Sequence, residues 1–245
     1  FLPVPPEEVI ESSFRTLTPV EFDWLPTTVE QIIRKAYLHQ LNLHELFEGT
    51  NPDIGKLTEL FSISTKSIPA MAKTVREKLG LTITEQSQWP NAEEAMKGWR
   101  DKLQQFGIFV FKDAFKDDDY SGFCLYDPQF PIIIINNSMV FSRQIFTLFH
   151  ELAHIIFKTS GIDKIIDDYV ERLPAAASKI EVACNAFAGE FLAPRSVIQS
   201  LLRERNLGTF TEEHISDIAR QFNVSRTVIL RKLLDLKQVS QSVYD

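Results

Sequence analysis

Apolar residues recur every three or four positions through the first hundred residues, as on one face of an α-helix. This spacing predicts four helices, over residues 28–47, 54–61, 67–80 and 92–106. In the third, Pro69 stands in the first turn and Gly80 at the end, the usual residues at helix termini. Residues 1–30 are proline-rich and poorly periodic, so we expect an extended arm there.

Short β-rich runs follow the helices. They predict three strands, over residues 108–111, 121–126 and 132–135. The third strand is an unbroken run of isoleucine, which indicates burial on both faces. We therefore expect an α+β fold, mostly helical, with a small three-stranded sheet packed on the next helix.

That next helix carries the strongest chemical signal in the chain. It is apolar on nearly every side, which predicts burial, and Ser142 could form its N-cap. His150 and His154 lie four residues apart, so both imidazoles project from one face of the helix. Imidazole nitrogens bind zinc well, and the carboxylate of Glu151 can reach a metal-bound water as a general base. The motif predicts a zincin-like catalytic zinc site.

A catalytic zinc ion needs three protein ligands and one open position. We expect the third ligand from a second helix within residues 179–194, which ends at a proline. Glu181 is the preferred candidate. Cys184 is a good ligand chemically but would more commonly be a packed thiol, and Glu190 is set about 90° away from Glu181 around the helix. Asp167 and Asp168 are the remaining alternatives.

Two supporting roles stay open. Asn185, one turn beyond Glu181, can orient a ligating imidazole or carboxylate through a hydrogen bond, or can be a plain residue of the helix face. A second donor to the oxyanion is usual in such sites. Tyr169, Arg195 and His214 are candidates, and the sequence does not choose among them.

The C-terminal part, from residue 211 on, has the pattern of a helix-turn-helix. Residues 215–222 form a short amphipathic helix, Asn223 suits a left-handed turn, and Ser225 can cap a second helix that continues to Leu234. Helical spacing predicts a buried face made of Ile215, Ile218, Phe222, Ile229 and Leu233. Basic side chains that could face phosphates are Arg226, Arg231 and Lys232. Packing on the rest of the protein is the favoured interpretation because the chain is acidic.

Composition limits the possible classes of protein. The net charge of −7 over 245 residues argues against a surface built to coat nucleic acid. Two lone cysteines, Cys124 and Cys184, fit a reducing compartment, which favours a cytoplasmic protein. Neither a signal peptide nor an apolar run of membrane-spanning length is evident, so no membrane partner is expected.

We divide the chain into three parts. These are an N-terminal arm with a helical segment at 1–66, a zinc metallopeptidase domain at 67–203, and a helix-turn-helix-like segment at 204–245. Because the chain begins with Phe1 rather than methionine, we expect it to be a fragment or a processed product.

Over residues 71–236 the chain resembles the ImmA/IrrE family of bacterial and phage metallopeptidases. The likeness rests on FTLFHELAH at 146–154, EVACNAFAGEFLAP at 181–194, and IARQFNVS at 218–225. The strand at 131–136 is also similar. One departure is Ala193, where the family often has methionine.

The resemblance implies that His150, His154 and Glu181 bind zinc and that Glu151 is the catalytic base. It also implies that the C-terminal segment belongs to the peptidase unit. Family members cleave, or act through, helix-turn-helix repressors and so start stress responses or the induction of mobile elements. The expected substrate is therefore a transcriptional repressor. Separately, because the chain is acidic and has few basic residues in this segment, any binding of DNA by this fragment should be weak. The alternative is a transcriptional regulator or antitoxin-like module in which the metal is structural or sensory.

Overall fold

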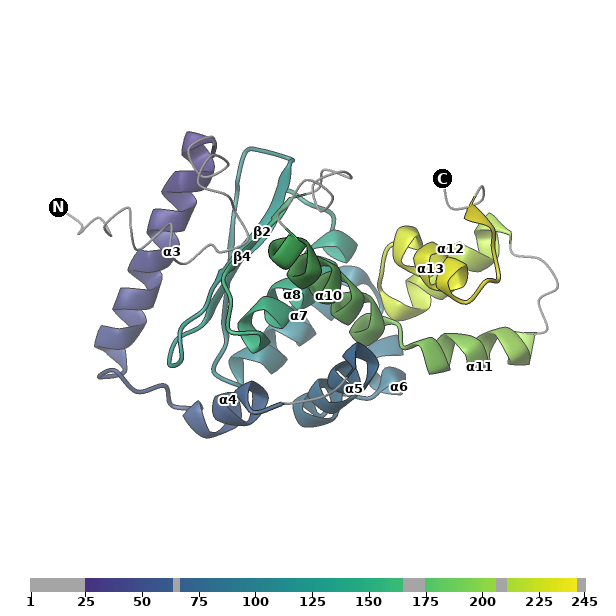
Figure 1. Cartoon of the computed structure of the whole chain (residues 1–245), viewed down its shortest axis with the longest axis horizontal. Helices are drawn as coiled ribbons and strands as arrows, with labels where there is room; N and C mark the ends of the chain where they lie inside the picture. Colours follow the sequence, from purple (N-terminus) through teal and green to yellow (C-terminus); the bar gives the residue numbers. More distant parts are fainter. Residues whose placement is uncertain (1–24, 64–66, 165–174, 206–210, 242–245) are drawn as a thin grey trace.

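The computed structural model describes residues 25–63, 67–164, 175–205 and 211–241 (Figure 1). The first half contains α3 (Thr27–Leu46), α4 (Ile54–Phe61), α5 (Ile68–Leu79), α6 (Ile83–Ser87), α7 (Ala92–Gln104), β1 (Phe109–Asp113), β2 (Tyr120–Leu125) and β3 (Ile132–Asn136). The second half contains α8 (Phe141–Ile156), β4 (Gly161–Lys164), α10 (Ala175–Leu192), α11 (Arg195–Arg205), α12 (Glu212–Phe222) and α13 (Arg226–Asp235). The fold is therefore α+β, as predicted.

The sheet has four strands in the order β1-β3-β2-β4, so the expectation of three strands was wrong. β1 runs parallel to β3, whereas β2 is antiparallel to both β3 and β4. The additional strand, β4, lies in a segment for which no strand was predicted. It has four residues, of which Asp163 and Lys164 are charged, so no alternation of apolar and polar residues marks it.

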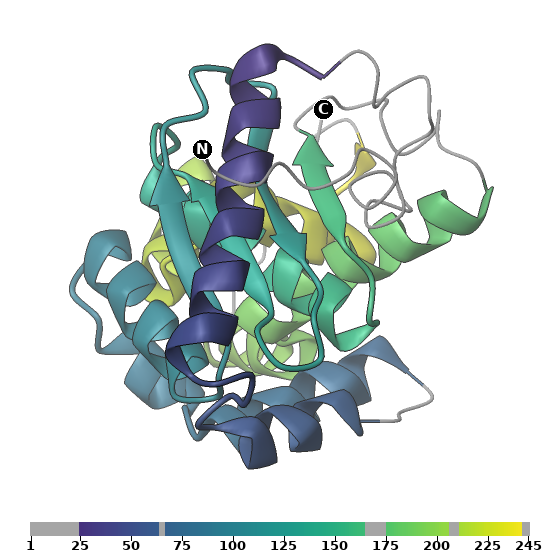
Figure 2. The same ribbon diagram turned by 90° about the vertical axis from the view of Figure 1, so that its left-hand side faces the viewer.

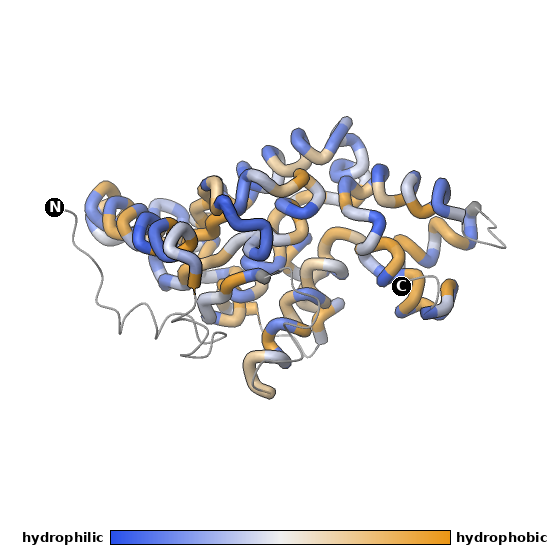
Figure 3. The backbone as a smooth tube through the Cα atoms, turned by 90° about the horizontal axis from the view of Figure 1, so that it is seen from above, coloured by the Kyte–Doolittle hydropathy of each residue, from blue (hydrophilic) through white to orange (hydrophobic). Residues whose placement is uncertain are grey.

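Both faces of the sheet are covered, which explains the isoleucine run of β3. Ile132 and Ile134 belong to the apolar cluster beneath α3, whereas Ile133 and Ile135 belong to the larger cluster that contains α8. Figure 2 shows α3 lying across the sheet. Hydrophilic and hydrophobic residues alternate along α3 in Figure 3, as expected for a helix with one buried face.

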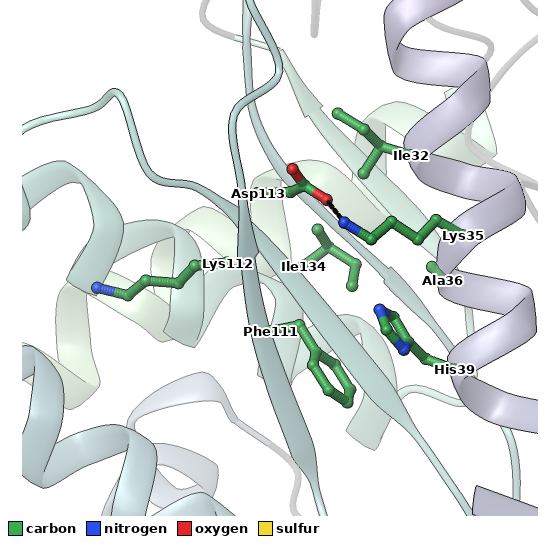
Figure 4. Close-up of a pocket in the computed structure, with 8 residues that line it drawn as sticks. All are labelled: Ile32, Lys35, Ala36, His39, Phe111, Lys112, Asp113 and Ile134. Carbon is green, nitrogen blue, oxygen red and sulfur yellow. Dashed lines mark hydrogen bonds and ion pairs between the residues drawn. The ribbon is translucent and has the colours of Figure 1, made fainter. Parts of the chain in front are cut away.

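A small pocket lies between α3 and β1 on the same side of the sheet (Figure 4). Lys35 and Asp113 form an ion pair of 2.5 Å across it. The rings of His39 and Phe111 stack with their centroids 4.4 Å apart. These contacts fasten the helix to the edge strand of the sheet.

The predicted helices are present, but the residues predicted to cap them are only partly correct. The Ser67 side chain accepts a hydrogen bond from Ala70 N, and Gly80 closes α5 with φ of 62°. Ser142, in contrast, is not an N-cap, because it lies inside α8, which begins at Phe141. The N-cap position is occupied by Val140, whose side chain forms no hydrogen bond there. Helices α6 and α11 were not predicted.

The C-terminal helices pack on the body of the protein. Asn223 adopts the left-handed conformation with φ of 55°, and the Ser225 side chain caps α13 by accepting from Val228 N. All five apolar residues predicted for the packed face are buried. On α6, the Gln86 amide donates to Phe222 O at 2.9 Å and to Leu192 O at 3.0 Å. Among the described residues, none of the helices combines the length and apolarity that a membrane crossing requires.

Candidate metal centre

Helix α8 places three ionisable side chains in the interior. His150, Glu151 and His154 are each at most 1% exposed. The two histidines point their Nε2 atoms at each other across 3.1 Å. Helix α10 packs along α8 and brings Glu181 to the same point: its Oε2 lies 3.1 Å from His150 Nε2, and its Oε1 lies 3.3 Å from His154 Nε2.

These separations suit a tetrahedral metal. Ligands about 2.0–2.1 Å from zinc at tetrahedral angles stand roughly 3.3 Å apart. Both carboxylate oxygens of the buried Glu151 have no hydrogen-bond partner among the described residues. A buried anion without a partner is costly, and a divalent cation between the nitrogens would compensate these oxygens. The residues present therefore fit a zinc ion.

Burial and neighbouring charges shift the pKa values of the two histidines and the two glutamates at this centre. Burial alone would lower the pKa of His150, but Asp163, Glu181 and Glu151 together raise it to about 10. Burial opposes ionisation of Glu181, yet hydrogen bonds with His150 and His154 lower its pKa to about 2. Burial raises the pKa of Glu151 well above its usual value and lowers that of His154.

The far ring nitrogens of both histidines also have partners. Asn185 Oδ1 lies 3.0 Å from His150 Nδ1, so the residue expected one turn after Glu181 does reach the first imidazole. Thr159 Oγ1 lies 3.2 Å from His154 Nδ1. No sequence signal pointed to Thr159, because its contact depends on how the chain leaves α8.

The alternative third ligands differ in what their side chains contact. Cys184 lies in the same cluster, where its Sγ and one nitrogen of each histidine are within 4.8 Å of one another. Glu181 is the better match because its carboxylate faces both nitrogens at shorter distances. Glu190 instead forms an ion pair with Lys232 at 2.5 Å and accepts from Arg195 N. Asp167 and Asp168 lie outside the described residues.

Among the described residues, two candidates for the oxyanion donor, Arg195 and His214, form no hydrogen bond with the metal ligands. His214 takes part in the capping box at the start of α12, with Thr211. Arg195 begins α11, directly after the turn that follows α10. Tyr169 lies outside the described residues.

A buried acidic residue beside the site was missed by sequence reasoning. Asp163 Oδ2 accepts hydrogen bonds from Thr147 Oγ1 at 3.0 Å, from Arg143 Nη2 at 2.9 Å, and from Ser121 Oγ. Arg143 and Thr147 lie on α8, and Ser121 lies on β2. Asp163 thus ties β4 to the helix that carries the metal ligands.

Comparison with known proteins relates this chain to a family of metallopeptidases. A family model described as the IrrE N-terminal-like domain matches residues 103–234, more than half of the chain. The chain is 32% identical over 112 residues to "Radiation response metalloprotease IrrE" of Deinococcus deserti, a match that covers 45% of this chain and 38% of that protein. It is 30% identical over 112 residues to the protein of the same name from Deinococcus radiodurans, covering 45% of this chain and 33% of that protein.

The matched region thus spans 38% and 33% of the two curated relatives, well under half of each. A solved structure described as a "Mycobacterium tuberculosis transcriptional regulator" superposes with a TM-score of 0.47 at 16% identity, over 74% of this chain and 51% of that one. The family match extends from α7 to α13 and includes all the residues that line the candidate metal centre. On that match, the chain belongs to the metallopeptidase family of IrrE N-terminal-like domains.

Proposed function

We propose that this protein is a zinc-dependent endopeptidase whose metal ligands are His150, His154 and Glu181. The observation that carries the proposal is the convergence of three buried donor groups from α8 and α10, with separations of 3.1 to 3.3 Å between facing atoms. Glu151 lies beside this group without joining it. Three protein ligands and an adjacent free carboxylate are the pattern of a catalytic rather than a structural zinc site.

Bound zinc supplies Lewis-acid chemistry: it lowers the pKa of a water molecule toward about 7 and polarises a carbonyl. Glu151 takes the proton from the attacking water and passes it to the leaving amine. Burial holds the pKa of this carboxyl high, and positive charge among its neighbours would return it toward the range in which a base can accept and release a proton. Asn185 accepts from His150 Nδ1–H and so fixes the orientation of that ring.

We propose that the substrate is a protein, specifically a helix-turn-helix transcriptional repressor, whose cleavage starts a stress or mobile-element response. The curated relatives are named radiation response metalloproteases, which supports a role in stress. Two buried free thiols, Cys124 and Cys184, support action in the cytoplasm.

The test is to incubate the purified protein with the repressor encoded beside its gene, with zinc and with a chelator. Zinc-dependent cleavage at one position, lost with the chelator and in Glu151→Gln, is the expected result. Zinc binding without cleavage of that repressor would reject the proposed substrate. A protein that retains no zinc would reject the enzyme itself.

A second function is favoured by one observation, the position of Cys184 beside both histidines. If its thiolate joined His150, His154 and Glu181, the site would be closed, and the protein would be a regulator with a structural or sensory metal. X-ray absorption of the zinc-loaded protein distinguishes the two. A zinc–sulfur distance of about 2.3 Å would support the regulator, and only nitrogen and oxygen neighbours would support the peptidase.

A further inference from the structure

The segment that follows the metal helix turns back onto it. Lys158 adopts the left-handed conformation with φ of 58°. Lys158 N donates to Ile155 O at 3.0 Å, and Thr159 N donates to His154 O at 2.9 Å. A left-handed residue followed by a hydrogen bond that spans six residues is the Schellman arrangement of a helix C-terminus. This turn brings Thr159 directly beside the last metal-binding residue of α8.

The hydroxyl of Thr159 makes two contacts that together define where its proton lies. Its Oγ1 donates to His154 O at 3.2 Å and also lies 3.2 Å from His154 Nδ1. A hydroxyl has one proton and two lone pairs. Because the proton is used on the carbonyl, the ring nitrogen must be the donor, so Nδ1 carries a proton. The neutral ring then has its lone pair on Nε2, the atom that faces His150 and Glu181.

Two residues further on, Gly161 lies against the face of the same ring. A Cβ at this position would stand 2.6 Å from His154 Nε2 and 2.7 Å from both Cδ2 and Cε1. These distances are well inside van der Waals contact, so only glycine lets the strand and the ring approach this closely. Alanine here would force the imidazole or β4 to move.

The segment itself is held in place from two sides. Asp163 binds Arg143 and Thr147 of α8, as described above. Directly after β2, Tyr126 N donates to Ser160 Oγ at 2.9 Å. The stretch from Thr159 to Asp163 is therefore fixed on the sheet as well as on the helix, which makes it a rigid support for the ring.

We propose that Thr159 and Gly161 are positioning residues for His154. The Thr159 hydroxyl fixes the tautomer in which Nε2 carries the lone pair. Gly161, which has no side chain, lets β4 pack against the imidazole and so sets the plane of the ring. The inference rests on the proposed zinc site. Hydrogen-bond partners of metal ligands typically change metal affinity by about 10–100-fold when mutated. We expect effects of that size here, on metal binding itself and not only on catalysis.

The experiment measures zinc affinity by competition with a chromophoric chelator. Thr159→Val, which keeps the shape but loses the hydroxyl, should weaken zinc binding by about 10–100-fold, and Thr159→Ser should restore it. Gly161→Ala should weaken binding at least as much. Thr74→Val is the matched control, because the only hydrogen bond of the Thr74 hydroxyl within the described part of the chain goes to Ala70 O on α5. Gly55→Ala is the second control, because nothing lies within 4 Å of a Cβ there.

A spectroscopic readout separates positioning from general destabilisation. In the zinc-loaded wild-type protein, ¹⁵N-edited NMR should show a slowly exchanging proton on His154 Nδ1, lost in Thr159→Val and recovered in Thr159→Ser. Wild-type zinc affinity in Thr159→Val and Gly161→Ala would overturn the inference and leave the zinc site intact. A wild-type protein that binds no zinc would instead overturn the proposed function, and this inference with it.

Discussion

Glu151 differs from the two histidines of α8 in its contacts. Both carboxylate oxygens are buried and lack a hydrogen bond among the described residues, whereas His150 and His154 are each held at two nitrogens. A carboxylate placed in this way is free to exchange a proton with a substrate or a water. Its role should therefore be separable from metal binding by a substitution that keeps its shape.

Glu151→Gln should retain the zinc and the fold but lose peptidase activity by a factor of about 10² or more. The measurement is the rate of cleavage of a confirmed substrate, with zinc content determined on the same sample. Glu190→Gln is the matched control, because Glu190 bonds to Lys232 of α13 and to Arg195 N of α11 rather than to the metal ligands. Cleavage at the wild-type rate by Glu151→Gln would show that another group is the base.

The choice of third ligand can be tested in the same way. Glu181→Gln removes the charge that faces both Nε2 atoms, so it should lower zinc affinity sharply, as should His150→Ala. Cys184→Ser should leave zinc content near one per chain. Elemental analysis after chelator-free purification gives the answer. The reverse pattern, with zinc lost in Cys184→Ser and kept in Glu181→Gln, would assign the ligand to the thiol.

At the scale of elements, α6 shows how a five-residue helix can join distant parts of the protein. Gln86 is fully buried and binds the main chain of α10 and α12, while its Oε1 accepts from Arg76 Nη2 at 2.7 Å. Arg76 in turn donates to Phe191 O and lies over the Phe191 ring. Burial without a carboxylate partner lowers the Arg76 pKa to about 10.

Gln86→Leu should therefore lower the free energy of unfolding by about 2–4 kcal/mol, because it leaves several buried donors and acceptors without partners. Chemical denaturation followed by circular dichroism measures the change. Gln88→Leu is the control: it is the same substitution two residues along, at an exposed position, and should change stability by less than about 0.5 kcal/mol. Equal stability of the two variants would mean that the α6 contacts contribute little.

The elements that sequence predicted are those whose pattern is local. His150, Glu151 and His154 are fixed by helical spacing, and Ser67, Gly80, Asn223 and Ser225 act at the termini where their chemistry placed them. Ser142 is a local prediction that failed, but the failures near the metal centre involve contacts through space. β4 is too short and polar to show a period, and Lys158 ends α8 in a conformation usually left to glycine. Thr159 and Asp163 acquire their roles only once β4 folds back on α8.

At the scale of the whole molecule, the charges of the C-terminal helices bear on DNA binding. Arg220, Arg226 and Arg231 are paired with Asp217, Glu212 and Asp235, and Lys232 is paired with Glu190. With carboxylates beside these cations and a net charge of −7, the protein offers phosphates little net attraction.

We therefore predict that this chain binds duplex DNA weakly and without sequence preference. Any affinity should fall steeply with salt, because phosphate contacts release counterions. Fluorescence anisotropy with a labelled operator and a scrambled duplex, at two salt concentrations, tests this. A sequence-specific complex of nanomolar affinity at physiological salt would contradict it and support the regulatory function.

The same helices should be needed for the integrity of the peptidase. Ile218, Phe222 and Leu233 are fully buried in the apolar cluster that also contains α8 and α10. Asn223 Nδ2 donates to Trp89 O at 3.2 Å, which adds to the Gln86 contacts. Deleting Thr211 to Asp245 would expose that apolar face to water, at a cost of roughly 25 cal/mol for each Å² uncovered.

The truncated protein should be insoluble, or should unfold at a markedly lower temperature than the full chain and lose zinc with it. Arg220→Ala and Arg231→Ala in the full chain are the controls, because both side chains are exposed and their ion pairs contribute at most about 1 kcal/mol. Thermal unfolding and zinc content are measured on the truncated protein, on both control variants and on the unaltered full chain. A soluble truncation that retains zinc and full activity would show that α12 and α13 form a separate module, and their role would then have to be sought in binding rather than in support of the peptidase.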